Sequence, residues 1–257
     1  MLLYRLAPDG RYAAGYRGDR PRLLASDPWT TAVGSWRWGR ELDTTEPPLL
    51  APVVPGKIVG IGRNYRDHAA ELGNPMPEEP LLFLKAPSSV IGPGEPVLLP
   101  PESGQVDFEG ELALVIGRRI HRVDERRARA AIFGFTCACD VTARDLQHRD
   151  RTFARAKSFD TFCPLGPALR MGADMEGCEV VTRINGEERQ RGSVAQMAWG
   201  PATLVRYVSR FMTLEPGDVL LTGTPAGVGS LAPGDRLEVE IAVVGTLAHP
   251  VASEAER

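Results

Sequence analysis

Apolar and polar residues alternate along residues 106–116, which predicts a β-strand with one chemically unusual face. Its apolar side chains stand at even positions: Val106, Phe108, Leu112, Leu114 and Ile116. Because side chains alternate across a pleated strand, Asp107, Glu109 and Glu111 project together from the other face. Two explanations remain open for three neighbouring carboxylates: a solvated face of an antiparallel sheet, or a hard divalent cation bound between them.

Patterns elsewhere in the chain predict more strands than helices. Helices are expected over 65–72, ending at Gly73, and over 124–132 and 201–211. Strands are expected over 2–6, 11–16, 57–62, 80–85, 97–99, 133–139, 180–184, 187–190, 219–220 and 236–237. Since the strands do not alternate with helices, we predict an α+β fold that is mainly β, with an antiparallel or mixed sheet.

A proline-rich segment divides the chain into two predicted domains. The region before it contains a predicted hairpin and then a stretch with little regular periodicity. Prolines then mark an extended linker: Pro47, Pro48, Pro52 and Pro55. We therefore expect a small N-terminal domain over 1–53 and a larger domain over 54–257.

Composition narrows the class of protein. The chain of 257 residues is 43% hydrophobic and 25% charged, with a formal net charge of −3, as expected for a soluble globular protein. No basic run suggests a nucleic-acid partner, and no segment predicts a membrane span or a signal peptide. The four cysteines form no C-x-x-C pair, so we expect a reducing cytoplasm.

Lysine is rare among the basic residues. Only three of the 30 are lysines, Lys57, Lys85 and Lys157. A lysine in such an arginine-rich chain can place a compact, titratable ammonium where a guanidinium would not serve. These positions are therefore candidates for chemistry.

Two further patterns carry candidate chemistry. Asp140 follows the predicted strand 133–139 and could join Glu109 and Glu111 if the strands pair, giving oxygen ligands for Mg²⁺ rather than Zn²⁺. His68 and Glu71 share one face of a short helix, and an imidazole oriented by a carboxylate can act as a base near neutral pH. Taken singly, each acid could also be a solvated or capping residue, and His68 could be an exposed helix residue.

Six segments, in this order, resemble the fumarylacetoacetate hydrolase family, and the resemblance covers residues 57 to 245. They are Gly62-Arg63-Asn64-Tyr65-Arg66-Asp67-His68, Phe83-Leu84-Lys85-Ala86-Pro87, Asp107-Phe108-Glu109-Gly110-Glu111, Asp140-Val141-Thr142-Ala143-Arg144-Asp145, Lys157-Ser158-Phe159-Asp160 and Thr222-Gly223-Thr224-Pro225. The resemblance implies a mixed β-sheet, roll or barrel-like catalytic domain and a homodimer. The first 50 residues resemble only the variable small domain of bacterial members.

The resemblance also implies roles for individual residues. Glu109, Glu111 and Asp140 match ligands of Mg²⁺ or Mn²⁺, whereas Asp107 falls outside this set. His68 and Glu71 match a lid dyad that activates water. Lys157 matches a lysine that stabilises an enolate or protonates the leaving carbanion. Positions that bind the substrate or brace the site are matched by Lys85, Arg144, Gln147, Gln190, Gly223 and Thr224.

The implied function is metal-dependent chemistry on 2-oxo acids that carry a second carbonyl or carboxylate. Hydrolysis of a C–C bond, as in acylpyruvates, is expected because both residues of the dyad are present. The alternative is isomerisation of 2-hydroxyhepta-2,4-diene-1,7-dioate or decarboxylation of 5-oxopent-3-ene-1,2,5-tricarboxylate or oxaloacetate, in aromatic catabolism. A rival of another class is a non-catalytic ligand-binding protein.

Overall fold

A computed structural model describes residues 1–71, 73 and 75–254 of the chain. Its largest sheet has twelve strands, ten of which follow the order β4-β3-β2-β1-β14-β12-β11-β17-β6-β7, while β5 pairs with β1 and β8 with β14. Only the β17–β6 and β14–β8 pairs are parallel. The strands are β1 (Leu2–Leu6), β2 (Tyr12–Gly15), β3 (Arg22–Leu24), β4 (Trp38–Glu41), β5 (Leu49–Leu50), β6 (Ile58–Gly62), β7 (Leu81–Lys85), β8 (Val90–Ile91), β11 (Gly110–Ile116), β12 (Ile132–Cys139), β14 (Cys163–Met171) and β17 (Val219–Leu221).

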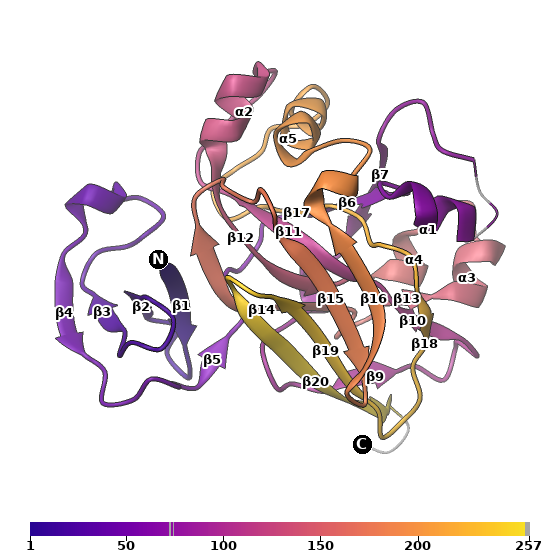
Figure 1. The fold of residues 1–257 in the computed structure, drawn as a ribbon, viewed down its shortest axis with the longest axis horizontal. Coiled ribbons are helices and arrows are strands. Elements are labelled where there is room, and N and C mark those ends of the chain that lie inside the picture. The colour runs from indigo at the N-terminus through magenta and orange to yellow at the C-terminus, as the bar shows by residue number, and fades with distance from the viewer. Residues whose placement is uncertain (72, 74, 255–257) are drawn as a thin grey trace.

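A second sheet of five strands packs on the centre of the large one, against β11, β12 and β14 (Figure 1). It has the order β16-β15-β19-β20-β9. Its members are β9 (Val97–Leu99), β15 (Glu179–Ile184), β16 (Glu187–Ser193), β19 (Arg236–Ile241) and β20 (Gly245–Ser253). The prediction of an α+β, mainly β fold with mixed sheets is confirmed.

Strand β11 is buried on both faces because it lies between two hydrophobic cores. Leu112, Leu114 and Ile116 point into the core between the two sheets. Ala113 and Val115 point the other way, into a core shared with the N-terminal strands. The strand that carries Glu111 is therefore held rigidly from both sides.

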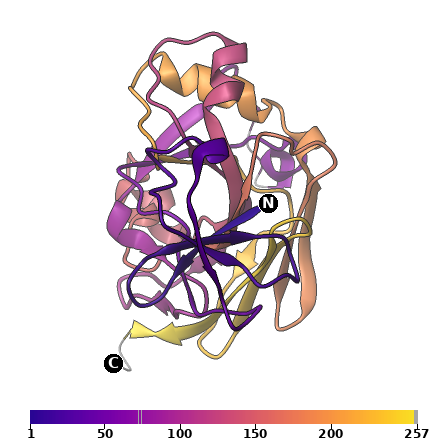
Figure 2. The same cartoon turned by 90° about the vertical axis from the view of Figure 1, so that its left-hand side faces the viewer.

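The N-terminal strands continue the large sheet. Leu2 and Leu3 of β1 pair with Arg170 and Leu169 of β14. Figure 2 shows these strands crossing in front of the larger body. The predicted hairpin between β1 and β2 is confirmed.

The remaining elements surround the end of β11. A small sheet of order β13-β10-β18 contains β10 (Val106–Phe108), β13 (Thr142–Ala143) and β18 (Gly229–Ser230). The helices α1, α3 and α4 lie together on the side of the molecule that carries β7 and β10 (Figure 1), whereas α2 packs on α5. Their bounds are α1 (Arg66–Glu71), α2 (Glu125–Ala131), α3 (Arg144–Arg149), α4 (Ala154–Lys157) and α5 (Pro201–Ser209), with 3₁₀ turns η1 (Val33–Ser35), η2 (Pro87–Ser89) and η3 (Val194–Gln196).

The helix predicted over 65–72 begins at Arg66 in the structure. Its expected last residue, Leu72, lies outside the described residues, as does Asn74 in the segment after it. None of the helices described is long and apolar enough to span a bilayer.

The prediction of one continuous strand over 106–116 is wrong at Glu109. The chain leaves the small sheet after Phe108 and enters the large sheet at Gly110. Strand β17, which pairs with β11, ends at Leu221. Gly110 therefore bonds to the side chains of Gln190 and Thr224 in place of a strand backbone, as described below. This break in the strand falls at Glu109, so Asp107 and Glu111 belong to two different sheets.

Candidate active site

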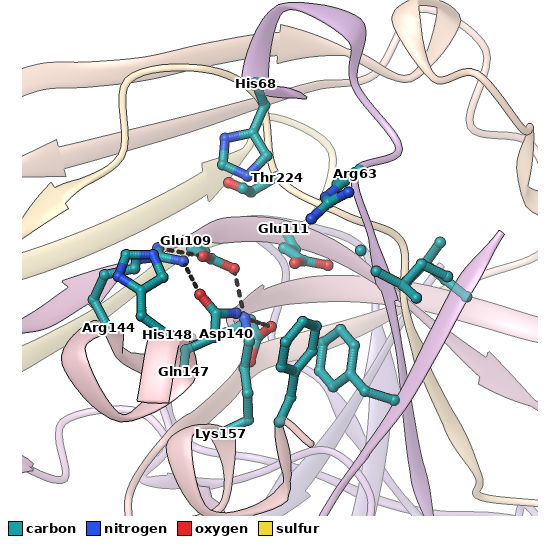
Figure 3. Close-up of a pocket in the computed structure, with 15 residues that line it drawn as sticks. Arg63, His68, Glu109, Glu111, Asp140, Arg144, Gln147, His148, Lys157 and Thr224 are labelled. Carbon is teal, nitrogen blue, oxygen red and sulfur yellow. Dashed lines mark hydrogen bonds and ion pairs between the residues drawn. The ribbon is translucent and has the colours of Figure 1, made fainter. Parts of the chain in front are cut away.

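A cavity of about 440 Å³ opens beside the start of β11. It collects residues from α1, the β10–β11 junction, the end of β12, α3, α4 and the loop after β17 (Figure 3). Eight of the residues predicted for the site line it: His68, Glu109, Glu111, Asp140, Arg144, Gln147, Lys157 and Thr224.

Three buried carboxylates meet at one side of this cavity. Glu109, Glu111 and Asp140 each offer an oxygen, and these oxygens all lie within 4.8 Å of one another. Asp140 directly follows strand β12, and its N–H donates to the carbonyl of Glu109 at 2.8 Å. The pairing of β11 with β12 therefore brings the three acids together, as the sequence predicted.

Two of the three carboxylates are paired with buried cations. The Lys157 ammonium donates to Glu109 at 2.8 Å and to Asp140 at 2.5 Å. Arg144 donates to the other oxygen of Glu109 at 2.6 Å, and Lys85 donates to the other oxygen of Asp140 at 2.6 Å. Both oxygens of Glu109 and of Asp140 thus accept a bond from a cationic group.

Glu111 differs from its two neighbours. Among the described residues its carboxylate forms no ion pair and accepts one hydrogen bond, from the Gly223 N–H at 2.6 Å. Burial, followed by the charges of Asp140 and Glu109, raises the pKa of Glu111 well above its ordinary value. Burial would also raise the pKa of Glu109, but the charges of Lys157 and Arg144 outweigh burial and hold this pKa low.

This cluster fits a hard divalent cation. All three donors are carboxylate oxygens, with no histidine or cysteine in the group, which suits Mg²⁺ or Mn²⁺ better than Zn²⁺. Among the described residues no cation pairs with Glu111, so ionising this buried carboxyl carries an electrostatic cost. A bound cation would remove that electrostatic cost.

A side-chain clamp fixes the residue between the two glutamates. The Gln190 amide oxygen accepts from the Gly110 N–H at 2.9 Å, and its nitrogen donates to Thr224 Oγ1 at 2.7 Å. Thr224 Oγ1 in turn donates to the Gly110 carbonyl at 2.8 Å. A Cβ atom at Gly110 would lie 1.9 Å from Thr182 Oγ1, so only glycine fits here. The clamp therefore sets the relative positions of Glu109 and Glu111.

His68 lies on the opposite side of the cavity from Lys157 (Figure 3). Its Nδ1 is 3.4 Å from Glu71, whose carboxylate also accepts from the Gly227 N–H at 2.9 Å. Glu71 thus fastens α1 to the loop after β17 and orients the imidazole. With Nδ1 directed at Glu71, Nε2 remains for chemistry in the cavity.

Four residues predicted for the site do not line the cavity. Glu71 supports His68, and Lys85 lies beneath Asp140 with a fully buried side chain. The Gln190 amide bonds to Gly110 and Thr224, and the Gly223 N–H bonds to Glu111. All four contact residues that line the cavity. Asp107, expected outside the ligand set, accepts from Arg144 at 2.8 Å and so braces the guanidinium that holds Glu109.

The sequence interpretation missed several lining residues, among them Arg63, Leu81, Phe83, His148 and Phe153. Two signals could have found three of them. Leu81 and Phe83 alternate with Lys85 on one face of β7. His148 follows Arg144 by four residues on α3.

Neither Cys163 nor Ser193 lines the cavity or is suited to act as a nucleophile. Burial raises the pKa of the Cys163 thiol to about 12. The Ser193 hydroxyl accepts from the Ala195 N–H at the start of η3. The cavity, in contrast, offers carboxylates, an imidazole and an ammonium.

Similarity to known proteins agrees with this geometry. Residues 57–252 match the model of the fumarylacetoacetate (FAA) hydrolase C-terminal family. A mitochondrial oxaloacetate tautomerase from Homo sapiens is 44% identical over 223 residues, covering 82% of this chain and 71% of that protein.

Solved structures are similar over nearly the whole chain. A 5-carboxymethyl-2-hydroxymuconate delta-isomerase from Mycobacterium smegmatis is 39% identical, with a TM-score of 0.88, and the match covers 99% of this chain and 100% of that one. A fumarylacetoacetate hydrolase from Exiguobacterium antarcticum is 35% identical, with a TM-score of 0.84 and the same coverage. The chain therefore belongs to the fumarylacetoacetate hydrolase family.

Proposed function

We propose that this protein is a divalent-cation-dependent enzyme that converts 2-oxo acids through an enolate. The observation that carries this proposal is the convergence of the three carboxylates, the Lys157 ammonium and His68 on one cavity. Glu109, Glu111 and Asp140 would hold Mg²⁺ or Mn²⁺. When bound, the ion supplies Lewis-acid stabilisation for the 2-oxo-carboxylate end of the substrate.

Hydrolysis of a C–C bond is the first candidate reaction, with an acylpyruvate as substrate. His68 Nε2 accepts a proton from water, and the water oxygen bonds to the distal carbonyl carbon. The C–C bond then breaks, its electron pair passes into the pyruvate enolate, and a proton from Lys157 Nζ completes pyruvate. The other product is the carboxylic acid released from the acyl group, and His68 then returns its proton to solvent while Lys157 takes one up, which restores both groups.

Lys157 is well placed for the proton donation. Burial disfavours its charge, but the charges of Asp140 and Glu109 more than compensate and raise the pKa of the ammonium. The ammonium is therefore protonated at neutral pH. It also lies 4.9 Å from the centre of the Phe83 ring, which forms part of the cavity wall.

Isomerisation is a second candidate, favoured by the names of the similar tautomerase and isomerase. If water is excluded, His68 and Lys157 could move a proton between two atoms of the same enolate. Decarboxylation would form an enolate as CO₂ leaves, from the electron pair of the broken C–C bond. All three reactions share an enolate of a 2-oxo acid, formed by C–C cleavage in hydrolysis and decarboxylation and by loss of a C3 proton in isomerisation.

Solvent deuterium exchange tests the shared enolate. Wild-type protein with Mg²⁺ should exchange the C3 protons of a 2-oxo acid in D₂O, followed by NMR, and exchange should stop after chelation. Binding without exchange or turnover would support the non-catalytic alternative and contradict the proposal.

Product analysis then separates the reactions. A panel of acylpyruvates, oxaloacetate and hydroxydienedioates is incubated under defined metal conditions. His68→Gln should abolish release of pyruvate from acylpyruvates while C3 exchange persists, if hydrolysis is the reaction. If the wild type releases pyruvate from acylpyruvates no faster than buffer does, but tautomerises oxaloacetate, the reaction is isomerisation and the hydrolysis proposal is wrong.

A further inference from the structure

Arg63 is the cationic residue of the cavity wall that the chemistry above leaves without a role. It follows β6 and points into the cavity on the side away from Arg144 and Gln147 (Figure 3). The other arginine and lysine side chains of this wall, Arg144 and Lys157, form ion pairs with carboxylates. Among the described residues, Arg63 forms neither an ion pair nor a side-chain hydrogen bond.

The backbone holds Arg63 in an unusual conformation. Its φ is +57°, a left-handed value that costs a non-glycine residue free energy and that glycine or asparagine adopts more readily. Three other described non-glycine residues have positive φ, and none of them lines the cavity. An ordinary surface arginine would not need this conformation, and strain of this kind is concentrated at functional sites.

The neighbouring residue explains why Arg63 is fixed in this position. The Asn64 side chain is fully buried and donates to the carbonyls of Thr222 and Trp199, at 2.7 and 3.1 Å. It also accepts from the Trp199 N–H at 2.9 Å. The backbone that carries Arg63 is thus tied to the loop beside Thr224, so that the guanidinium is presented from a rigid support.

Part of the cavity wall is apolar. Ile61, Leu81, Phe83 and Phe153 line it. A substrate can therefore place its 2-oxo-carboxylate end at the cluster, its carbon chain against this wall and a second anionic group at Arg63. A guanidinium with free donors binds a carboxylate through two parallel hydrogen bonds.

We propose that Arg63 binds the distal carboxylate of the substrate and makes the enzyme selective for dicarboxylic 2-oxo acids over acids with an uncharged end. This inference rests on the proposed function, because it assumes that a 2-oxo acid occupies the cluster. Arg63 is then a determinant of specificity, and it takes no part in proton transfer.

A matched pair of ligands tests the selectivity without turnover. 2-Oxoglutarate and 2-oxopentanoate share a 2-oxo acid end and chain length, and differ in whether the chain ends in a carboxylate or a methyl group. Neither has the 1,3-dicarbonyl unit that hydrolysis requires. Their dissociation constants are measured by calorimetry with Mg²⁺ present.

Wild-type protein should bind 2-oxoglutarate at least tenfold more tightly than 2-oxopentanoate. Arg63→Gln should reduce this ratio to about one while leaving the affinity for 2-oxopentanoate unchanged, which also shows that the variant is folded. Arg63→Lys should keep part of the preference. The matched control is Arg66→Gln, because Arg66 is exposed three residues along the chain, outside the cavity wall, and it should leave the ratio unchanged.

An unchanged ratio in Arg63→Gln overturns the inference and leaves the proposed function intact. Equal loss of affinity for both ligands also overturns it, because the residue would then support the site in general. Failure of the proposed function looks different: wild-type protein would bind neither ligand and exchange no C3 protons, and the inference would fall with it.

Discussion

At the scale of single residues, the site combines paired and unpaired buried charges. Glu109 and Asp140 are neutralised by Lys157, Arg144 and Lys85, whereas Glu111 is left with a backbone N–H alone. Breaking a buried ion pair leaves a charge uncompensated, but neutralising an unpaired buried charge removes a cost. Substitutions at Glu109 or Asp140 should therefore destabilise the fold, whereas a neutral substitution at Glu111 should not.

Glu111→Gln should separate folding from metal binding. Without metal, the variant should melt at the same temperature as the wild type or higher, because glutamine is neutral, whereas ionisation of the unpaired, buried Glu111 is unfavourable. Its affinity for Mn²⁺, measured by electron paramagnetic resonance, should fall by about a hundredfold, or ~2.7 kcal/mol. Exposed Glu187→Gln is the control and should change neither quantity, because Glu187 forms no ion pair among the described residues. Wild-type affinity in Glu111→Gln would exclude Glu111 as a ligand.

Gln190→Leu should weaken the site through the backbone of Gly110. The variant leaves the Gly110 N–H without its partner, which costs about 1 to 3 kcal/mol for a buried group. We expect this loss in the free energy of unfolding and a roughly tenfold weaker affinity for Mn²⁺, or ~1.4 kcal/mol. Both are measurable by denaturant titration and calorimetry.

Thr182→Val is the matched control for the clamp. Thr182 also packs against Gly110, but its hydroxyl has no hydrogen-bond partner among the described side chains and backbone groups. Replacing it should leave the affinity for Mn²⁺ unchanged. Lower stability with unaltered Mn²⁺ affinity in Gln190→Leu would show that the clamp serves the fold alone.

At the scale of elements, the sequence predicted what depends on local pattern. The hairpin β15–β16 around Asn185-Gly186, the Asp124 cap of α2 and Pro201 at the first turn of α5 follow from neighbouring residues. The break at Glu109 does not, because it depends on the bond from Gly110 to Gln190, which lies 80 residues after Gly110. The position of Arg63 was missed for the same reason, since its support comes from Thr222 and Trp199.

The candidate site was predictable to a similar extent. The alternation around Glu109 suggested a carboxylate face, but taken alone this pattern favoured a solvated sheet face over a metal site. The order of six motifs resolved the choice, and the structure brings Glu111 and Asp140 together accordingly. The sequence did not distinguish the residues that line the cavity from those that support it. Gln190 and Lys85 belong to the second group, which only the packing of the folded chain reveals.

Strand β20 contains a buried histidine that should make stability depend on pH. His249 Nδ1 donates to the Glu95 carbonyl at 2.7 Å, while Nε2 has no partner in the described chain. Burial lowers the pKa of His249 below its ordinary value, although the bond to Glu95 opposes this shift. The unfolded chain therefore binds a proton more readily, and stability falls as the pH drops below about 6.5, by at most ~1.4 kcal/mol per pH unit.

His249→Asn tests this assignment. The asparagine amide can keep the bond to Glu95 but does not titrate. The free energy of unfolding of the wild type should fall more steeply between pH 7 and 5 than that of the variant, measured by urea titration at each pH. Parallel pH profiles for the two proteins would exclude His249 as the source.

At the scale of the whole molecule, the two predicted domains share one sheet and one core. Strand β1 pairs with β14, and Leu3, Ala14 and Trp36 belong to the same buried cluster as Val115 of β11. Residues 1–53 therefore contribute to the hydrophobic core on the face of β11 that points away from the five-stranded sheet. We expect them to unfold together with residues 54–257 in one cooperative transition.

Leu3→Ala tests this coupling. Leu3 is fully buried, and its truncation should cost about 2 to 5 kcal/mol. The tryptophans provide separate probes, because Trp29, Trp36 and Trp38 lie in the N-terminal region while Trp199 lies beside Asn64. Fluorescence of the wild type and of a Trp199→Phe variant should give one shared midpoint, lowered equally by Leu3→Ala. Two midpoints, with only the N-terminal one lowered, would mean that the carboxylate site is supported without residues 1–53.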